Sequence, residues 1–369
     1  MKKLLTFLAT FLILGITVPS ATAVENEIVV ITEVSHRNFD GVFRDDSLAQ
    51  ILAPTGRLGK LIYVPIKTNR TWLIDPALVD DVVAMTNDYS IQNKAPITGK
   101  DIALSWITQL RYVTSRNQVI ALPYGNPDVK LAKRLAPSEL KRYYSYGNES
   151  LSKNLIRLVS TRPSLTSSKT ASRLSNSERV SYTQNRQRLT ELSRVVAAPE
   201  LESLRSRLAI LLSTSLNRNN RKYFSLQATK AVNNEVSKIK INEGKYRLTS
   251  AEVKVPVTIT NKYSIPITVD LWLTPSNFRV YTPNIRDITI PANSKLQLSM
   301  DVSVVAPGNT IVEAQLTDSK GNDVGDPARL SLNLTVIDSR VAWFTTGAAI
   351  ILFLAAVAQS VRRIRRSKK

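Results

Sequence analysis

The sequence predicts an α+β protein of several domains: an N-terminal α/β domain, a basic helical segment, a β-sandwich of the fibronectin or immunoglobulin kind and one transmembrane helix. Three observations support this prediction. Strand-like and helix-like stretches alternate over residues 24–160, short alternating strands follow over residues 236–337, and an uncharged apolar stretch occupies residues 341–361. The length of 369 residues is sufficient for two or three domains.

The composition excludes several classes of functional site. The chain has no cysteine and one histidine, His36. Disulfide frameworks, thiolate zinc sites, cysteine nucleophiles and sites with two histidine ligands are therefore excluded. We expect neither a metal site nor a cofactor. His36 follows the first predicted strand, and a lone histidine is more often hydrogen-bonded or solvent-exposed than functional.

Residues 1–23 have the features of an export signal. Two lysines precede an apolar run over residues 4–18, and small residues of the A-x-A type end at Ala23. We expect export followed by removal of this signal peptide. An uncleaved N-terminal anchor is the alternative interpretation.

Residues 341–361 are predicted to cross a membrane. They contain no charged residue, and a helix of 21 residues is long enough to span about 30 Å of hydrocarbon. Six cations follow within residues 362–369, which by the positive-inside bias places this basic tail in the cytoplasm. The prediction is a single-pass cell-membrane protein with its N-terminus outside.

The positive charge is concentrated in one part of the exported region. The whole chain has 50 basic and 29 acidic residues, and residues 129–224 alone carry 19 basic and 6 acidic ones. Outside a cell, such a segment favours phospholipid headgroups, wall polymers or an acidic protein as partners, and not nucleic acid. A solvated basic surface without a specific partner is the alternative. The candidate binding residues are Arg186, Arg188, Arg194, Arg205 and Arg207.

The first domain, residues 24–160, alternates between two hydrophobic periods. The pattern predicts strands at Glu27–Val34, Leu61–Pro65, Thr71–Ile74 and Val119–Leu122. It predicts helices that begin near Ser47, at Pro76 with Asp75 as N-cap, and at Ala103. Strands that alternate with helices indicate a parallel sheet, either open and doubly wound or part of a trimmed barrel.

Polar residues follow two of these strands and should meet at one edge of the sheet. Asp75 follows the strand ending at Ile74, and Tyr124, Asn126 and Asp128 follow the strand ending at Leu122. Two carboxylates there could act as acid and base in glycoside cleavage. The alternative is that Asp75 and Asp128 only cap the helices that begin at the next residue. Tyr124 and Asn126 are candidate binding residues at the same edge.

The second segment, residues 161–235, begins with a Ser/Thr-rich, basic linker over residues 161–177. Helical spacing of leucines then predicts a helix from Pro199 to about Asn217–Asn220. Arginines 194, 205, 207 and 218 fall among these leucines, so we expect one apolar face on the sheet and one cationic face towards solvent.

The third segment, residues 236–337, has strict alternation of apolar and polar residues. The runs around residues 253–259, 265–273 and 296–304 are the clearest, and Pro, Asn and Gly separate them. Several such strands over about 100 residues are typical of an antiparallel β-sandwich, and the lack of cysteine favours the fibronectin type. Its last strand ends just before residue 341, so the sandwich is expected to stand on the membrane as a stalk.

Several sequence strings resemble a known family. They are Arg44–Ala49, Pro54–Leu58, Trp72–Val79 and Ala121–Val129, followed by Leu248–Ser250 before Val255–Asn261. Their order and spacing resemble an actinobacterial family of secreted, single-anchor proteins of unknown function. The chain departs from that family in two respects: its barrel-like region is shorter, and Asn126 stands where members commonly have Asp. These departures favour an open α/β domain and weaken a catalytic role at the sheet edge.

The resemblance implies an envelope protein whose gene often lies beside that of the lipid II flippase, and hence a part in peptidoglycan assembly. It implies no established activity. The leading hypothesis is a non-enzymatic binding or scaffold protein of the cell envelope, with wall polymer, a lipid-linked precursor or a membrane transporter such as the flippase as partner. The alternative is a glycan-active hydrolase with a degenerate barrel that uses Asp75 and Asp128. A regulatory role of the basic arm on a neighbouring transporter is a third hypothesis.

Overall fold

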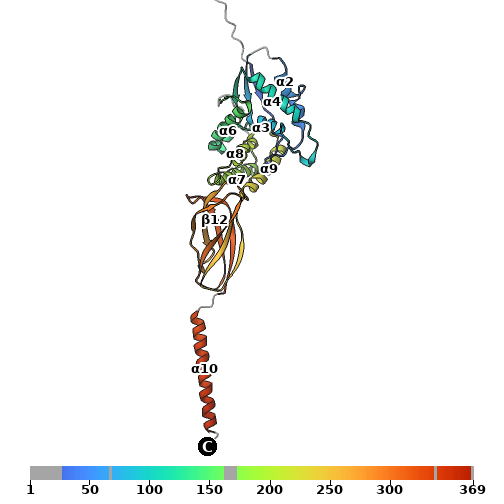
Figure 1. The fold of residues 1–369 in the computed structure, drawn as a ribbon. Helices are drawn as coiled ribbons and strands as arrows, with labels where there is room; N and C mark the ends of the chain where they lie inside the picture. Colours follow the sequence, from blue (N-terminus) through green and yellow to red (C-terminus); the bar gives the residue numbers. More distant parts are fainter. Residues whose placement is uncertain (1–26, 66–68, 162–172, 336–338, 367–369) are drawn as a thin grey trace, which may run out of the picture.

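The computed structural model describes residues 27–65, 69–161, 173–335 and 339–366. The predicted export signal lies outside these residues, as does most of the predicted linker at 161–177. An N-terminal α/β part, a group of helices, a β-sandwich and a long C-terminal helix follow one another along the molecule (Figure 1).

The N-terminal part contains the predicted open parallel sheet. Its strands are β1 (Glu27–Ile31), β2 (Arg70–Ile74), β3 (Gln118–Ala121) and β4 (Ser160–Thr161). They lie in the order β1-β2-β3-β4, and every neighbouring pair is parallel. Because all carboxyl ends point the same way, the loops after β1, β2 and β3 meet at one edge of the sheet. We call this edge, with residues 32–37, 75 and 122–128, the rim.

Helices surround this sheet. They are α1 (Ser47–Leu52), α2 (Arg57–Tyr63), α3 (Pro76–Met85), the short 3₁₀ helix η1 (Gln92–Lys94), α4 (Lys100–Thr114), α5 (Val129–Leu135) and α6 (Pro137–Leu155). The predicted strand Leu61–Pro65 is wrong, because α2 extends to Tyr63. Leu58 and Ile62 lie one helical turn apart and are both buried, so they form the apolar face of a helix.

The middle of the chain is helical, with α7 (Asn176–Leu192), α8 (Pro199–Arg207), the 3₁₀ helix η3 (Leu208–Leu212) and α9 (Arg218–Val236). The helix predicted from Pro199 is shorter than expected. Its backbone becomes extended at Ser213, and Asn217 then caps a new helix by accepting a hydrogen bond from the N–H of Asn220. The asparagines expected to end one helix therefore begin the next.

The C-terminal strands form the predicted β-sandwich. They are β5 (Ile239–Ile241), β6 (Gly244–Leu248), β7 (Glu252–Asn261), β8 (Ile267–Pro275), β9 (Val280–Tyr281), β10 (Ile285–Ile290), β11 (Ser294–Val304), β12 (Gly308–Thr317) and β13 (Asp323–Leu334). One sheet has the order β5-β7-β11-β9 and the other β10-β8-β12-β13-β6. The neighbours β5-β7-β11-β9 and β8-β12-β13 correspond to the two sheets of an immunoglobulin fold.

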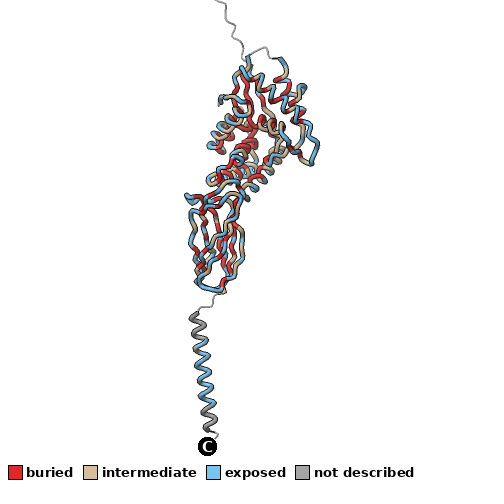
Figure 2. Tube along the Cα trace, viewed as in Figure 1, coloured by how far each residue is buried: buried red, intermediate tan, exposed pale blue. Residues whose placement is uncertain are grey.

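The sandwich is packed directly against the helices. One cluster of buried apolar side chains runs from Tyr124 at the rim, through α7, η3 and α9, to Leu334 at the end of β13. Figure 2 shows these buried stretches continuing from the upper part of the molecule into the sandwich. At the junction, the Tyr263 hydroxyl donates to a carboxylate oxygen of Glu235 at 2.9 Å. The helices and the sandwich therefore share a core.

The chain ends in a long helix, α10 (Ser339–Arg366), which stands apart from the rest (Figure 1). Its side chains are described for residues 346–360, so the predicted membrane span at 341–361 is described only in part. Within that part of the chain, no helix combines the length and apolar character needed to cross a membrane.

Candidate functional site

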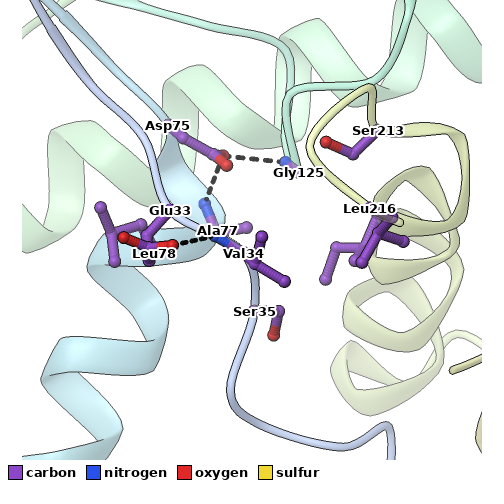
Figure 3. Close-up of a pocket in the computed structure, with 10 residues that line it drawn as sticks. Glu33, Val34, Ser35, Asp75, Ala77, Leu78, Gly125, Ser213 and Leu216 are labelled. Carbon is purple, nitrogen blue, oxygen red and sulfur yellow. Dashed lines mark hydrogen bonds between the residues drawn. The ribbon is translucent and has the colours of Figure 1, made fainter. Parts of the chain in front are cut away.

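The rim brings the polar residues after β2 and β3 together. Asp75 caps α3 by accepting a hydrogen bond from the N–H of Ala77 at 3.0 Å. The same oxygen accepts the N–H of Gly125 at 2.9 Å, so one carboxylate fastens two of the three loops (Figure 3). Asp75 is only 3% exposed. Its position follows from the local Asp-Pro sequence, in which proline fills the first helical position and the preceding carboxylate caps the helix.

Burial dominates the electrostatics of Asp75. Removal from water raises the pKa of Asp75 to about 7, although its two backbone hydrogen bonds favour the charged form. The adjoining cavity measures about 10 Å³ and is lined by residues that include Glu33, Ser35 and Ser213. That volume accommodates at most one water molecule, so a sugar ring does not fit beside this carboxylate.

Asp128 is also a buried helix cap. Its Oδ1 accepts a hydrogen bond from the N–H of Leu131 at 3.0 Å, at the start of α5. Its own backbone N–H donates to the carbonyl of Leu212 at 2.9 Å. Both carboxylates weighed for glycoside cleavage are thus buried and committed to helix N-termini. The geometry agrees with the capping alternative.

Tyr124 and Asn126 have structural positions as well. The Tyr124 hydroxyl donates to Asp80 at 2.9 Å, and the tyrosine ring is completely buried. Asn126 adopts a left-handed backbone conformation with φ of 42° in the turn that follows. Its N–H donates to the carbonyl of Pro123. Tyr124 is inaccessible to a ligand, whereas Asn126 is half-buried.

The helical segment closes the rim. Pro127 pairs with Ser213 in a short antiparallel bridge. Gly125 lies so close to η3 that an added Cβ would meet the backbone nitrogen of Ile210 at 2.9 Å. In Figure 3 the loop that carries Ser213 lies directly opposite Gly125. The edge of the sheet that usually holds a ligand is covered here by the protein's own chain.

A buried ion network joins this cover to the sheet domain. Arg207 at the end of α8 lies 3.1 Å from Asp81 on α3, and Arg37 lies 2.8 Å from the same oxygen. The hydroxyl of Ser35 donates to the other oxygen at 2.7 Å. Burial alone would raise the pKa of Asp81, but the charges of Arg207 and Arg37 outweigh burial and hold that pKa below its usual value.

A second buried pair lies nearby. Arg205 donates through Nε to Glu139 of α6 at 2.9 Å and through a terminal nitrogen to the other oxygen. The expectation that Arg205 and Arg207 face solvent is therefore wrong, since each neutralises a buried carboxylate of the preceding domain. Arg207 is not available to an external anionic partner, and Arg205, which is 8% exposed, reaches a surface groove while it stays paired with Glu139.

The other predicted binding arginines differ from one another. Arg188 forms an ion pair with Asp326 of the sandwich at 2.6 Å. Arg186 is half-buried, and its Nε has no hydrogen-bond partner in the structure. Arg194 is exposed and lines a groove. Of the five arginines, Arg194 is thus the most accessible.

This groove is the candidate binding surface. It has a volume of about 670 Å³ and lies between α6, the connection from α7 to α8, and α8 itself. The polar and charged residues that line it are Arg142, Arg194, Arg205, Thr190, Ser193, Glu149 and Glu202. Arg142 also forms an ion pair with Glu202 in the groove. A ligand with phosphate or carboxylate groups could exchange with this internal pair.

Several residues of the network were missed by sequence reasoning, namely Arg37, Asp80, Asp81 and Glu139. Asp81 gave one usable signal, because it lies within the apolar pattern of α3 between Leu78 and Val82. His36 does not join the rim carboxylates. Its Nδ1 lies 3.1 Å from the hydroxyl of Ser47. Among the described residues, no group of three or more His, Asp or Glu is placed to hold a metal ion.

The structure defines a closed α/β domain joined by buried ion pairs to helices and an immunoglobulin-like sandwich. Residues 132–369 match the model of a family of unknown function, DUF6049, and the chain belongs to that family. The match covers the Leu248–Asn261 strings but not the earlier strings at residues 44–129. No curated protein matches this chain.

Solved structures resemble about a quarter of the chain. WR4, a Caenorhabditis elegans MSP family member, is 14% identical over 26% of this chain and 97% of its own length, with a TM-score of 0.20. PapD-like domain 7 of human CEP192 is 10% identical over 27% of this chain and 87% of its own, with a TM-score of 0.21. The secreted serine protease VesC from Vibrio cholerae is 8% identical over 26% of this chain but only 23% of its own, also with a TM-score of 0.21.

Proposed function

We propose that this protein is a non-enzymatic binding or scaffold component of the cell envelope, anchored by residues 341–361 with its folded part outside the cell. The closed rim is the observation that carries the non-enzymatic role. Asp75 and Asp128 are buried helix caps, and the chain's own η3 covers the position where a substrate would lie. The hydrolase alternative thereby loses the open carboxylate pair on which it depended.

The anchor is supported by sequence and by exposure. Residues 341–361 carry no charge and precede a cationic tail. The described large apolar side chains of α10 are 45–70% exposed, on successive positions all around the helix. A helix that is apolar on every side is stable when lipid or protein surrounds it. Lipid is the surrounding that the flanking charges favour.

The groove supports a partner with anionic groups. Its volume is within the range of small-molecule sites, and Arg142 and Arg194 line it beside the carboxylates of Glu149 and Glu202. Wall polymer and lipid-linked wall precursors offer the carboxylate or phosphate groups that such a surface would recognise. On the basis of the sequence resemblance to envelope proteins encoded beside the lipid II flippase, we propose a role in peptidoglycan assembly, in contact with a membrane transporter such as that flippase.

Topology can be tested because the chain has no cysteine. Ser319→Cys places a thiol on an exposed turn of the sandwich, and Ser367→Cys places one in the predicted tail. A membrane-impermeant maleimide should label residue 319 in intact cells and residue 367 only after permeabilisation. Labelling of residue 367 in intact cells, or protection of residue 319, contradicts the proposed topology.

Partner binding is tested with the full-length protein in detergent. We expect it to sediment with purified wall sacculi, or to retain lipid-linked wall precursor dissolved in the same detergent when the tagged protein is captured. Arg194→Gln should weaken this several-fold, whereas Arg218→Gln, an exposed arginine outside the groove, should not. Absence of binding to both materials overturns the binding role, and equal binding by the two variants excludes the groove.

A further inference from the structure

The sandwich carries its most exposed apolar side chains at one end. In the described strands and loops from β5 to β13, the three largest exposures of bulky hydrophobic residues belong to Phe278 at 99%, Val305 at 72% and Tyr281 at 64%. Phenylalanine in full contact with water is unfavourable, and soluble surfaces rarely gather such residues without a partner. We call these three residues the apolar tip.

The strand pairing places all three residues together. Val280 pairs with Val304, and Tyr281 with Ser303, so the loop that follows β11 lies beside β9. The N–H of Val305 also donates to the carbonyl of Arg279 at 2.7 Å, which fixes Phe278 and Val305 in adjacent loops. The apolar tip is therefore built from β9 and the two loops that adjoin it.

This surface lies at the end where the chain leaves the sandwich. Gly308, three residues after Val305, pairs with Leu334, the last residue of β13. Thr335 is tied to the same end by donating its N–H to the carbonyl of Leu248 at 2.8 Å. From Thr335 to Val341 the chain can reach at most about 20 Å. The proposed membrane span thus holds the apolar tip close to the bilayer.

We propose that the apolar tip inserts into the outer leaflet of the cell membrane, at the boundary between lipid and water. The sandwich would then contact the lipid directly, in addition to being anchored by residues 341–361. The inference rests on the proposed membrane span. Tyrosine gains from this interface because its ring enters the apolar layer while its hydroxyl stays wet, and phenylalanine gains because its ring is removed from water. Arg279, between Phe278 and the strand β9, lies where it can meet lipid phosphate groups.

The full-length protein in lipid nanodiscs provides the test. Phe278→Cys and the control Ser319→Cys, on the turn between β12 and β13 at the opposite end of the sandwich, are each labelled with bimane. We expect doxyl-labelled phospholipid to quench the fluorescence of bimane at residue 278 several-fold more than that of bimane at residue 319. Aqueous iodide should give the reverse order.

The outcomes separate the two proposals. If the protein fails to enter nanodiscs and is removed by alkaline carbonate, the anchor and the tip insertion both fail. If the protein is anchored but iodide quenches residues 278 and 319 equally, only the insertion is overturned. Protection of residue 278 from iodide without quenching by doxyl lipid indicates a protein partner or a second copy, and also overturns the insertion.

Discussion

Arg207 and Asp81 are buried partners, with 3.1 Å between a guanidinium nitrogen and a carboxylate oxygen, and they join α8 to α3 across 126 residues of sequence. This pair fastens the helical segment over the sheet edge. The rim is therefore closed by electrostatics as well as by apolar packing. In a low-dielectric interior, removal of one charge leaves the other unpaired.

Replacement of Arg207 by Met should destabilise the protein strongly. Asp81 would keep only Arg37 and Ser35 as partners, and loss of one member of a buried pair costs about 3–5 kcal/mol. The free energy of unfolding in urea measures the effect. Arg218→Met, at an exposed position, is the matched control. The double variant Arg207→Met with Asp81→Asn should recover part of the loss, and no recovery would contradict the pairing argument.

Asp75 should make stability depend on pH in the opposite direction from Asp81. Burial raises the pKa of Asp75 from 3.8 to about 7, so the folded state holds this proton more tightly than the unfolded state. The contribution of Asp75 to the free energy of unfolding is largest below about pH 4. It decreases as the pH rises and reaches its minimum above about pH 7. The full difference corresponds to about 4 kcal/mol.

Asp75→Asn provides the comparison, because its amide oxygen can still accept the N–H groups of Ala77 and Gly125. We expect the free energy of unfolding of the wild type, relative to that of the variant, to fall by a few kcal/mol between pH 4.5 and 7.5. A constant difference across this range would show that the pKa of Asp75 is not raised.

The features that the sequence predicted correctly are those that depend on residues close together in the chain. Asp75 before Pro76 specifies a helix start within two positions, and the alternation around Val253–Ile259 specifies a half-buried strand. The prediction of a strand at Leu61–Pro65 was wrong because a short apolar run fits a strand as well as a helix. The burial of Leu58 and Ile62 on one face of the segment is the observation that favours a helix, α2, over a strand.

The partners of the arginines could not be predicted. Glu139 lies 66 residues before Arg205, and Asp81 lies 126 residues before Arg207. Arginines among leucines at helical spacing are compatible with a solvent face or with buried ion pairs. The choice depends on whether carboxylates from another element reach them, which composition and spacing do not report. The net positive charge of the segment therefore led to the prediction of a larger exposed cationic surface than the structure contains.

Gly125→Ala should loosen the cover of the rim. Gly125 has φ of +73°, and its added Cβ would lie 2.9 Å from the backbone nitrogen of Ile210. Gly321→Ala is the matched control, because Gly321 has φ of +80° but open space around it. The control should lose only the strain of a left-handed alanine, about 1–2 kcal/mol. Gly125→Ala should lose more, with faster hydrogen exchange in Leu208–Leu212. Equal losses would show that η3 adjusts without cost.

The junction between the helices and the sandwich should depend on packing and not on its exposed ion pair. Arg188 and Asp326 are 2.6 Å apart, but the Asp326 side chain is 73% exposed. Asp326→Asn should therefore change the free energy of unfolding by less than about 1 kcal/mol, and salt should change it little further. Leu189, the next residue on α7, is completely buried in the shared core, so Leu189→Ala should cost about 2–5 kcal/mol. Urea unfolding of both variants makes the comparison, and a larger effect of Asp326→Asn would show that the ion pair dominates the junction.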